Sequence, residues 1–248
     1  MSESRLSVQL YTVRDAIAAN LTEAVTRLST IGFTQVEPYG FIERADEYRA
    51  VFDATGLTAP SAHAKLVGED LAPIFAAATK LGVTTVIDPH IAEERWTSRE
   101  LIAGVAADLN GFAKVAADHG LAVGYHNHAF ELENVIDGVS GLEILAEHLD
   151  PAVRLEVDTY WVAVGGQDPV ALLGRLGDRV GFLHVKDGPI TTDDKAQVAV
   201  GAGAVPVANV IAAAPSDALL VVELDDFDGD VFTAVTDSYA WLTAKGLK

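Results

Sequence analysis

The chain has 248 residues, half of them hydrophobic, and it contains no cysteine. The missing cysteines exclude disulfide bonds, thiolate metal ligands and a cysteine nucleophile, and they agree with a reducing, cytoplasmic environment. The formal net charge of −19 argues against a nucleic-acid partner, because such partners are held largely by basic side chains. MSESRLSVQL lacks the pattern of a signal peptide, and no apolar run approaches the roughly 18 residues of a membrane span. We therefore expect a soluble cytoplasmic protein without a membrane partner.

Short β-rich runs alternate with longer amphipathic segments along the chain. The runs are 6–13, 33–40, 57–64, 84–90, 121–128, 153–161, 179–187 and 218–226. Between them, segments such as 16–32 and 99–120 carry small apolar residues at helical spacing and end at a glycine. Eight such units without a linker predict an α/β fold, a single (β/α)8 TIM barrel over residues 1–248. No glycine-rich phosphate fingerprint follows the first run, which disfavours a dinucleotide-binding fold.

Polar side chains gather where the expected strands end, which is the functional face of a barrel of this kind. Five of the seven histidines occupy such positions, namely His63, His90, His126, His128 and His184. Four carboxylates do so as well, namely Glu37, Asp88, Asp158 and Glu223. Neutral imidazoles and carboxylates together suit a divalent ion such as Mn, Zn, Fe or Co.

The spacing within two of the runs predicts which side chains share a face. Residues two apart on a strand point the same way, so His126 and His128 should both face the barrel mouth while Asn127 turns away. By the same rule Glu156 should lie one layer below Asp158, as a buried polar residue that needs a partner such as arginine or lysine.

Seven motifs resemble those of the sugar phosphate isomerase/epimerase family of xylose isomerase-like TIM barrels, over essentially the whole chain. They are LSVQLYTVRD, GFTQVEPYG, YHNHAFEL, LEVDTYWV, FLHVKDG, VGAGAVP and VVELDD. The family includes tagatose and psicose epimerases, inosose dehydratase, dehydroshikimate dehydratase and the endonuclease IV group. The resemblance implies a metal-dependent enzyme acting on a small sugar, and because many members pair, a homo-oligomer is left open.

The resemblance also implies a set of metal ligands, usually Glu, Asp, His and Glu at successive strand ends. Asp158 of EVDTYW, His184 of FLHVKD and Glu223 of VVELD match the last three places. The first place falls on His126 of YHNH, a motif that one branch of the family carries. An imidazole can bind metal but cannot also abstract a proton as the carboxylate does, which disfavours a two-base epimerisation. The VGAGAVP loop also departs from relatives that carry an acidic residue between the glycines, so its role as a substrate loop is left open.

The expected chemistry is proton abstraction beside a metal-polarised carbonyl, which gives an enediolate. By resemblance Glu223 is the first candidate for the base, and His63, His128 and Lys186 are candidates for the partner acid or for hydroxyl contacts. For Lys186 the alternative is a surface lysine or an ion pair with Asp187. The residues expected to contact the sugar are Tyr11, Glu37, His90, Phe130 and Trp161.

Three functions remain open at this stage. The family's base rate favours an isomerase or epimerase of a sugar or keto-sugar. The missing glutamate shifts weight toward a dehydratase or lyase of a keto-sugar or inosose. A non-catalytic sugar-binding barrel is the third reading, whereas the net charge of −19 opposes an endonuclease.

Overall fold

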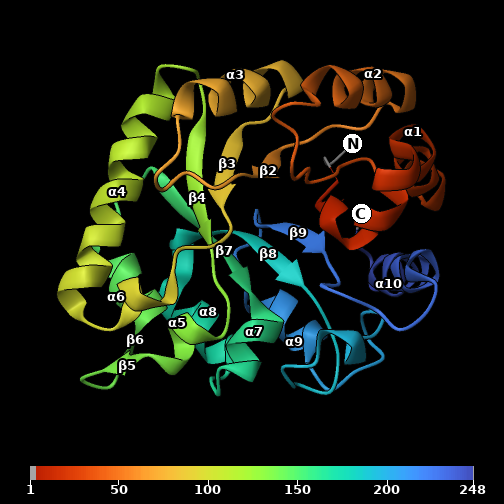
Figure 1. The fold of residues 1–248 in the computed structure, drawn as a ribbon. Helices are drawn as coiled ribbons and strands as arrows, with labels where there is room; N and C mark the ends of the chain where they lie inside the picture. The colour runs from red at the N-terminus through yellow and green to blue at the C-terminus, as the bar shows by residue number, and fades with distance from the viewer. Residues whose placement is uncertain (1–3, 248) are drawn as a thin grey trace.

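Parallel strands form the centre of the molecule, and helices surround them (Figure 1). The computed structural model describes residues 4–247. The hydrogen-bonded order of the main sheet is β1-β9-β8-β7-β4-β3-β2. Its strands are β1 (Leu6–Val8), β2 (Ser61–His63), β3 (Thr85–Asp88), β4 (Ala122–His126), β7 (Val153–Asp158), β8 (Val180–Val185) and β9 (Leu219–Val222). A separate antiparallel hairpin pairs β5 (Val135–Ile136) with β6 (Val139–Ser140).

The predicted strand over 33–40 closes the barrel, although it forms isolated bridges rather than a regular strand. Gln9 bridges to Glu37 on one side, and Tyr39 bridges to His63 on the other. Glu37 N donates to Val8 O at 2.9 Å, and His63 N donates to the carbonyl of Pro38 at 2.9 Å. Pro38 itself has no N–H to give to a ladder, so the pairing is interrupted there. This segment takes the place of the eighth strand, and the predicted (β/α)8 barrel is confirmed.

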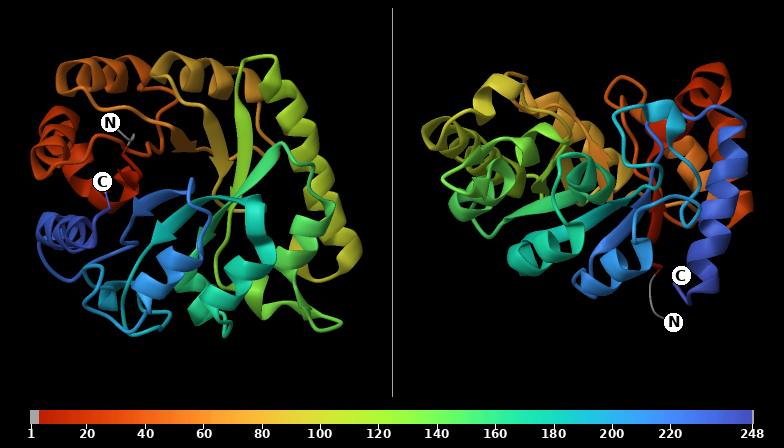
Figure 2. Two further views of the ribbon diagram at one scale, coloured as in Figure 1. Left: turned by 180° about the vertical axis from the view of Figure 1, so that it is seen from behind. Right: turned by 90° about the horizontal axis from the view of Figure 1, so that it is seen from below.

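Helices form the outer ring. The longer ones are α1 (Arg14–Ile31), α2 (Ala45–Thr55), α3 (Leu71–Leu81), α4 (Arg99–Ala117), α6 (Gly141–His148), α8 (Pro169–Leu176), α9 (Val207–Ala213) and α10 (Val231–Ala244). The short ones are α5 (Phe130–Glu133), α7 (Thr159–Val164), η1 (Leu10–Val13), η2 (Glu93–Trp96), η3 (Gly177–Arg179) and η4 (Asp194–Ala196). The first and last long helices lie side by side (Figure 2), where the Arg27 guanidinium stacks 4.0 Å from the Phe232 ring centroid.

Both helices predicted from spacing are present. The segment expected over 16–32 is α1, which is kinked at Asn20, where the Asn20 side chain accepts a hydrogen bond from Glu23 N. The segment expected over 99–120 is α4, which begins after the N-cap Ser98. Gly120 has φ +72 beyond its end, a backbone conformation that favours glycine.

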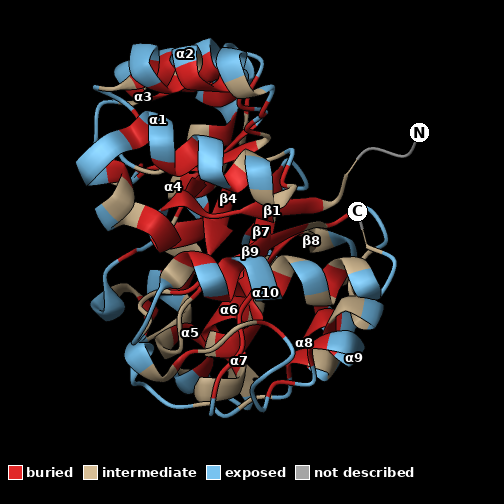
Figure 3. Ribbon diagram, turned by 90° about the vertical axis from the view of Figure 1, so that its right-hand side faces the viewer, coloured by how far each residue is buried: buried red, intermediate tan, exposed pale blue. Residues whose placement is uncertain are grey.

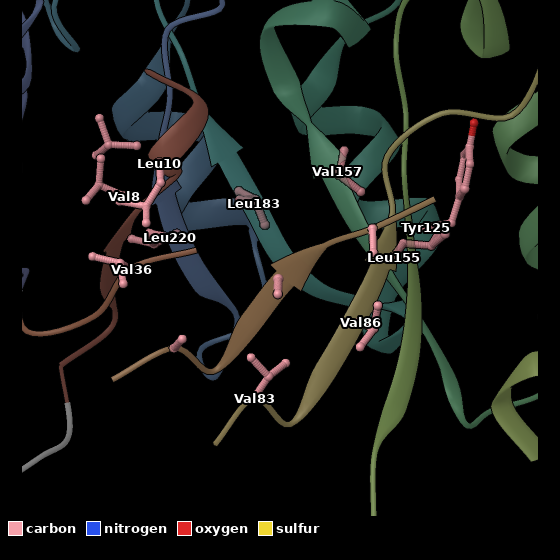
Figure 4. Packing of buried hydrophobic residues seen from close by; sticks show 14 of the residues in the cluster. Val8, Leu10, Val36, Val83, Val86, Tyr125, Leu155, Val157, Leu183 and Leu220 are labelled. Carbon is pink, nitrogen blue, oxygen red and sulfur yellow. The ribbon is translucent and has the colours of Figure 1, made fainter. Parts of the chain in front are cut away.

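The strands of the barrel are buried, and the outer faces of the helices are exposed (Figure 3). Aliphatic side chains of the strands, such as Val8, Leu155 and Leu220, belong to one buried core cluster (Figure 4). Among residues 4–247, no helix combines the length and the apolar character needed to cross a membrane. The parallel strands of the barrel thus end on one rim.

Candidate active site and metal centre

A cavity of about 600 Å³ opens at the carboxyl ends of the strands. Seven predicted site residues line it, namely Tyr11, His63, His90, His126, His128, Trp161 and Glu223. Asp158, His184 and Lys186 are fully buried and lie just behind this lining. The structure therefore brings most of the predicted site to one place.

Four of these side chains form a compact group that we call the outer cluster: His126, Asp158, His184 and Glu223. They come from the ends of β4, β7 and β8 and from the residue after β9, and one donor atom of each lies within 4.8 Å of the others. His126 Nε2 and Asp158 Oδ2 are 3.9 Å apart, close to the separation of two donors that each lie about 2.1 Å from one ion. His184 Nδ1 and Glu223 Oε2 are closer, at 2.6 Å, and share a hydrogen bond.

One oxygen of the outer cluster, Asp158 Oδ2, would take a metal ion in place of its present cation, Lys186. Asp158 Oδ1 accepts the N–H groups of Tyr160 and Trp161, both at 3.0 Å, as the N-cap of α7. Among residues 4–247, no donor makes a well-directed hydrogen bond to the buried Oδ2. A buried carboxylate oxygen left in this state is costly unless a cation neutralises it.

The ionisation of the outer cluster also fits a metal ion. Burial and the nearby charge of His184 hold the pKa of His126 well below its usual value, so its imidazole is neutral, the form that ligates metals. Burial opposes a charge on His184, but Glu156 and Glu223 raise its pKa well above the usual value. These two carboxylates stabilise a positive charge, which a divalent ion would supply in place of a proton.

Beneath the outer cluster, Glu156 accepts from three imidazoles instead of the arginine or lysine expected as its partner. Glu156 Oε2 lies 2.5 Å from His63 Nε2, 3.1 Å from His126 Nδ1 and 3.1 Å from His184 Nε2. This group could itself hold a metal ion. We favour the outer cluster, because its carboxylate Glu223 lines the cavity whereas Glu156, the only carboxylate of the other group, does not. Glu156 instead orients the ligand histidines, as second-layer carboxylates do in metal sites.

Glu37 does not line the cavity, which corrects its predicted role in sugar contact. Its side chain is fully buried, and its carboxylate accepts from Gln9 Nε2 at 2.8 Å, from His184 Nε2 at 2.9 Å and from the Ser61 hydroxyl. Asp88 is also structural, because its carboxylate accepts the N–H groups of Leu66 and His90. These carboxylates hold the strand ends rather than a ligand.

Lys186 is neither a surface lysine nor a partner of Asp187, which corrects both alternatives. Its side chain is 1% exposed, and Nζ contacts Asp158, Glu223 and Asp225 within 2.8 Å. The opposing cost of burial is outweighed by these carboxylates, which raise the pKa of Lys186 well above its usual value. Burial likewise opposes a charge on Glu223, yet Lys186 and His184 hold its pKa well below the usual range.

The YHNHAFE segment leaves its strand after His126, and the loop that follows still brings His128 to the cavity. The His126 and His128 rings are 5.1 Å apart. Asn127 turns away as expected, and its Oδ1 accepts Asp158 N at 3.0 Å. Phe130 is not among the residues that line the cavity, and its ring stacks on that of His128 with centroids 5.8 Å apart, so its contact with a sugar stays a prediction.

Glu131 was not singled out in the sequence, although it closes the same motif. Its carboxylate accepts from the Tyr125 hydroxyl at 2.5 Å and from His128 N at 2.8 Å. Burial raises the pKa of Glu131 to about 8. It therefore fixes the backbone of His128 from below the cavity.

Trp161 lies on α7 and not on the strand predicted over 153–161, because the Asp158 cap starts a helix there. Its indole Nε1 donates to Asp225 Oδ2 at 3.2 Å. Asp225 also accepts from Gln197 Nε2 at 2.7 Å, and its own N–H donates back to Gln197 Oε1. Gln197 and Asp225 were not predicted as site residues, because nothing in their local sequence indicates that their side chains meet.

The GAGAV stretch wraps around Asp187, whose carboxylate accepts four backbone N–H groups. The donors, at 2.8 to 3.0 Å, are Gly188, Gly201, Gly203 and Val205. A Cβ at Gly203 would lie 2.2 Å from Asp187 Oδ1, which explains the glycine. The glycines of this loop thus enclose the carboxylate of Asp187, and the loop carries no acidic residue of its own between them.

Known proteins resemble this chain in sequence and in fold. An inosose dehydratase of Geobacillus kaustophilus is 31% identical over 123 residues, which are 48% of this chain and 39% of that protein. The chain thus matches well under half the length of that relative. A solved sugar phosphate isomerase/epimerase of Parabacteroides distasonis gives a TM-score of 0.83 at 22% identity and covers 100% of this chain and 96% of that one. A solved IOLI protein with a bound zinc atom gives 0.70 at 16% identity, over 98% and 95%.

At these identities the solved structures establish a likeness of fold. The family model described as xylose isomerase-like TIM barrel matches residues 25–244, which is most of the chain. The family predicted from the motifs is thereby confirmed, and the chain belongs to the xylose isomerase-like TIM barrel family.

Proposed function

We propose that this protein is a metal-dependent lyase that removes water, or another β-leaving group, from a neutral keto-polyol or keto-sugar. His126, Asp158, His184 and Glu223 would hold the ion. When bound, the ion polarises the substrate carbonyl and stabilises the negative charge that develops on its oxygen. The similarity to inosose dehydratases supports this class of reaction.

The observation that carries the proposal is the single carboxylate that the outer cluster presents to the cavity. His126 and Glu223 both line it, but His126 is neutral and accepts no proton once it ligates a metal. Glu223 is ionised and is the base that takes the proton beside the carbonyl. A β-elimination needs one base and one acid, whereas a two-base epimerisation needs a second base on the opposite face.

His63 is suited to be the acid. It lines the cavity, and although burial opposes its charge, Glu37 and Glu156 raise its pKa above the usual value, which favours the protonated form. Two groups whose surroundings move their pKa values apart are natural partners in acid and base catalysis. Because His63 Nε2 is held by Glu156, the proton on Nδ1 is the one that would go to the leaving hydroxyl.

The charges around the cavity favour a neutral, unphosphorylated substrate. Four carboxylates line it, namely Asp194, Glu223, Asp225 and Asp226. The cations that line it have other partners: Arg14 donates to the carbonyls of Tyr11 and Asp225, and Lys65 pairs with Glu69. A phosphate or carboxylate would therefore enter a lining in which the four carboxylates outnumber the two cationic side chains.

A sugar isomerase or epimerase is the second candidate, and His128 is the observation that favours it. Burial lowers the pKa of His128 to about 4, so its imidazole is neutral at pH 7. Its buried Nδ1 has no hydrogen-bond partner among residues 4–247. The neutral His128 imidazole lines the cavity and would be the second base of such an enzyme.

Incubation with Co²⁺ and a neutral inosose in D₂O, followed by ¹H NMR, separates the candidates. Loss of water from the substrate supports the lyase, and deuterium incorporation with an isomeric product supports the isomerase. Asp158→Asn should lose the metal and the reaction while the circular dichroism spectrum stays unchanged. A variant that keeps its full metal content would refute the ligand assignment, and binding without solvent exchange would leave a sugar-binding barrel.

A further inference from the structure

Lys186 contacts three carboxylates, two of which belong to the outer cluster. Its Nζ lies 2.8 Å from Asp158 Oδ2, 2.8 Å from Glu223 Oε2 and 2.7 Å from Asp225 Oδ1. An ammonium group has three N–H donors, so Lys186 can donate one to each of the three carboxylates. In this arrangement the lysine neutralises the carboxylates that a metal ion would need.

The lysine and the metal would use the same oxygen atoms. Asp158 Oδ1 is occupied by the N–H groups at the start of α7, so Oδ2, the atom beside Lys186, is the one left for an ion. Glu223 presents Oε2 to His184 and to Lys186. An ammonium and a divalent ion a few ångströms apart in a buried site repel each other strongly. Bound metal and the present lysine contacts therefore exclude one another.

Asp225 offers Lys186 a partner outside the outer cluster. Both of its oxygens lie 2.7 Å from Nζ. Asp225 is held from the other side by Trp161 Nε1 and by Gln197, which is buried in the loop that Asp187 organises. Because Asp225 is not one of the cluster residues, it keeps its place when the cluster oxygens are taken.

We propose that Lys186 is a built-in competitor for the metal ion, and that Asp225 takes over its ammonium group when the ion binds. The proposal rests on the metal centre of the proposed function. Lys186 neutralises the metal-free site and so keeps the barrel mouth folded without an ion. It also weakens metal binding, which makes the ion exchangeable. Asp225 strengthens metal binding without touching the ion, because it lowers the cost of moving the lysine.

Co²⁺ titration by isothermal calorimetry tests this exchange in four variants. Lys186→Met should bind Co²⁺ at least tenfold more tightly than the wild-type protein, whereas Lys186→Arg, which keeps the charge, should not gain affinity. Asp225→Asn should bind at least tenfold more weakly. In the Lys186→Met background the same Asp225→Asn change should have little effect, because no lysine remains to be moved. Equal or weaker binding by Lys186→Met would overturn the proposal.

A second readout covers the case in which Lys186→Met is destabilised without metal, since it leaves three carboxylates together. The rise in melting temperature between EDTA and Co²⁺ should then be larger for Lys186→Met than for the wild-type protein. If Co²⁺ shifts neither protein, the metal centre and this inference fail together. If Co²⁺ shifts both equally, the metal centre stands and the competition by Lys186 is refuted.

Discussion

Replacing Asp187 with alanine should remove the central acceptor of the loop between β8 and α9. The four N–H groups that it receives differ in their surroundings: Gly188 and Val205 are buried, whereas Gly201 and Gly203 are exposed. Water can replace the carboxylate at the two exposed donors. Each buried donor left without a partner costs about 1–3 kcal/mol, so the variant should lose roughly 2–6 kcal/mol of unfolding free energy.

Urea unfolding followed by circular dichroism measures this loss, with Asp193→Ala as the matched control. Asp193 lies in the same loop, but its carboxylate accepts one N–H, that of Lys195, at an exposed position. The control should lose about 1 kcal/mol or less, the usual range for a surface cap. If Asp187→Ala loses no more than Asp193→Ala, then the four hydrogen bonds do not stabilise the loop as we infer.

Two further predictions concern the buried carboxylates Glu131 and Glu156. Burial raises the pKa of Glu131 to about 8 from 4.5, so the folded state holds a proton that the unfolded chain loses, and stability falls as the pH rises through that window. Glu131→Gln removes this pH dependence. Between pH 5 and pH 9 its unfolding free energy should therefore rise by on the order of 2–5 kcal/mol relative to that of the wild-type protein, as measured by urea unfolding at both pH values. Parallel curves of stability against pH for the two proteins would contradict the prediction. Glu156→Gln should weaken Co²⁺ binding about 10- to 100-fold with unchanged circular dichroism, because the ligand histidines lose their common acceptor. Unaltered affinity would show that Glu156 does not orient them.

The fold was predictable because each βα unit carries its own local pattern. Alternating β-rich runs and amphipathic segments indicate a barrel whatever the details of pairing. The segment over 33–40 shows the limit of such patterns, because Pro38 reduces its pairing to isolated bridges without changing its place in the barrel. The run over 153–161 shows another, because the side chain of Asp158 ends the strand by capping α7.

Most residues of the site were predictable from the sequence, but the contacts between them were not. Strand-end positions identified the residues around the cavity, since parallel strands end on one rim. The contacts between polar groups inside the barrel depend on side-chain length and on the register of the strands. Neither can be read from the local sequence. Glu37 was therefore expected to contact the sugar, and Glu156 to pair with an arginine or lysine. Lys186 was expected to act as an acid or hydroxyl contact, or else to lie at the surface or pair with Asp187. The resemblance to known motifs supplied ligand positions but not these contacts.

The buried charges at the barrel mouth explain why a metal ion suits this site. Glu156, Asp158 and Glu223 are buried close together, and half-buried Asp225 adjoins them. Charges in such a place persist only when cations neutralise them. Lys186 supplies one fixed positive charge, and the imidazoles add theirs only where they hold a proton. A divalent ion adds two charges without a proton, so it can keep the carboxylates ionised while leaving His126 neutral. An anionic substrate would reverse this balance, whereas a neutral polyol with a carbonyl group leaves it intact.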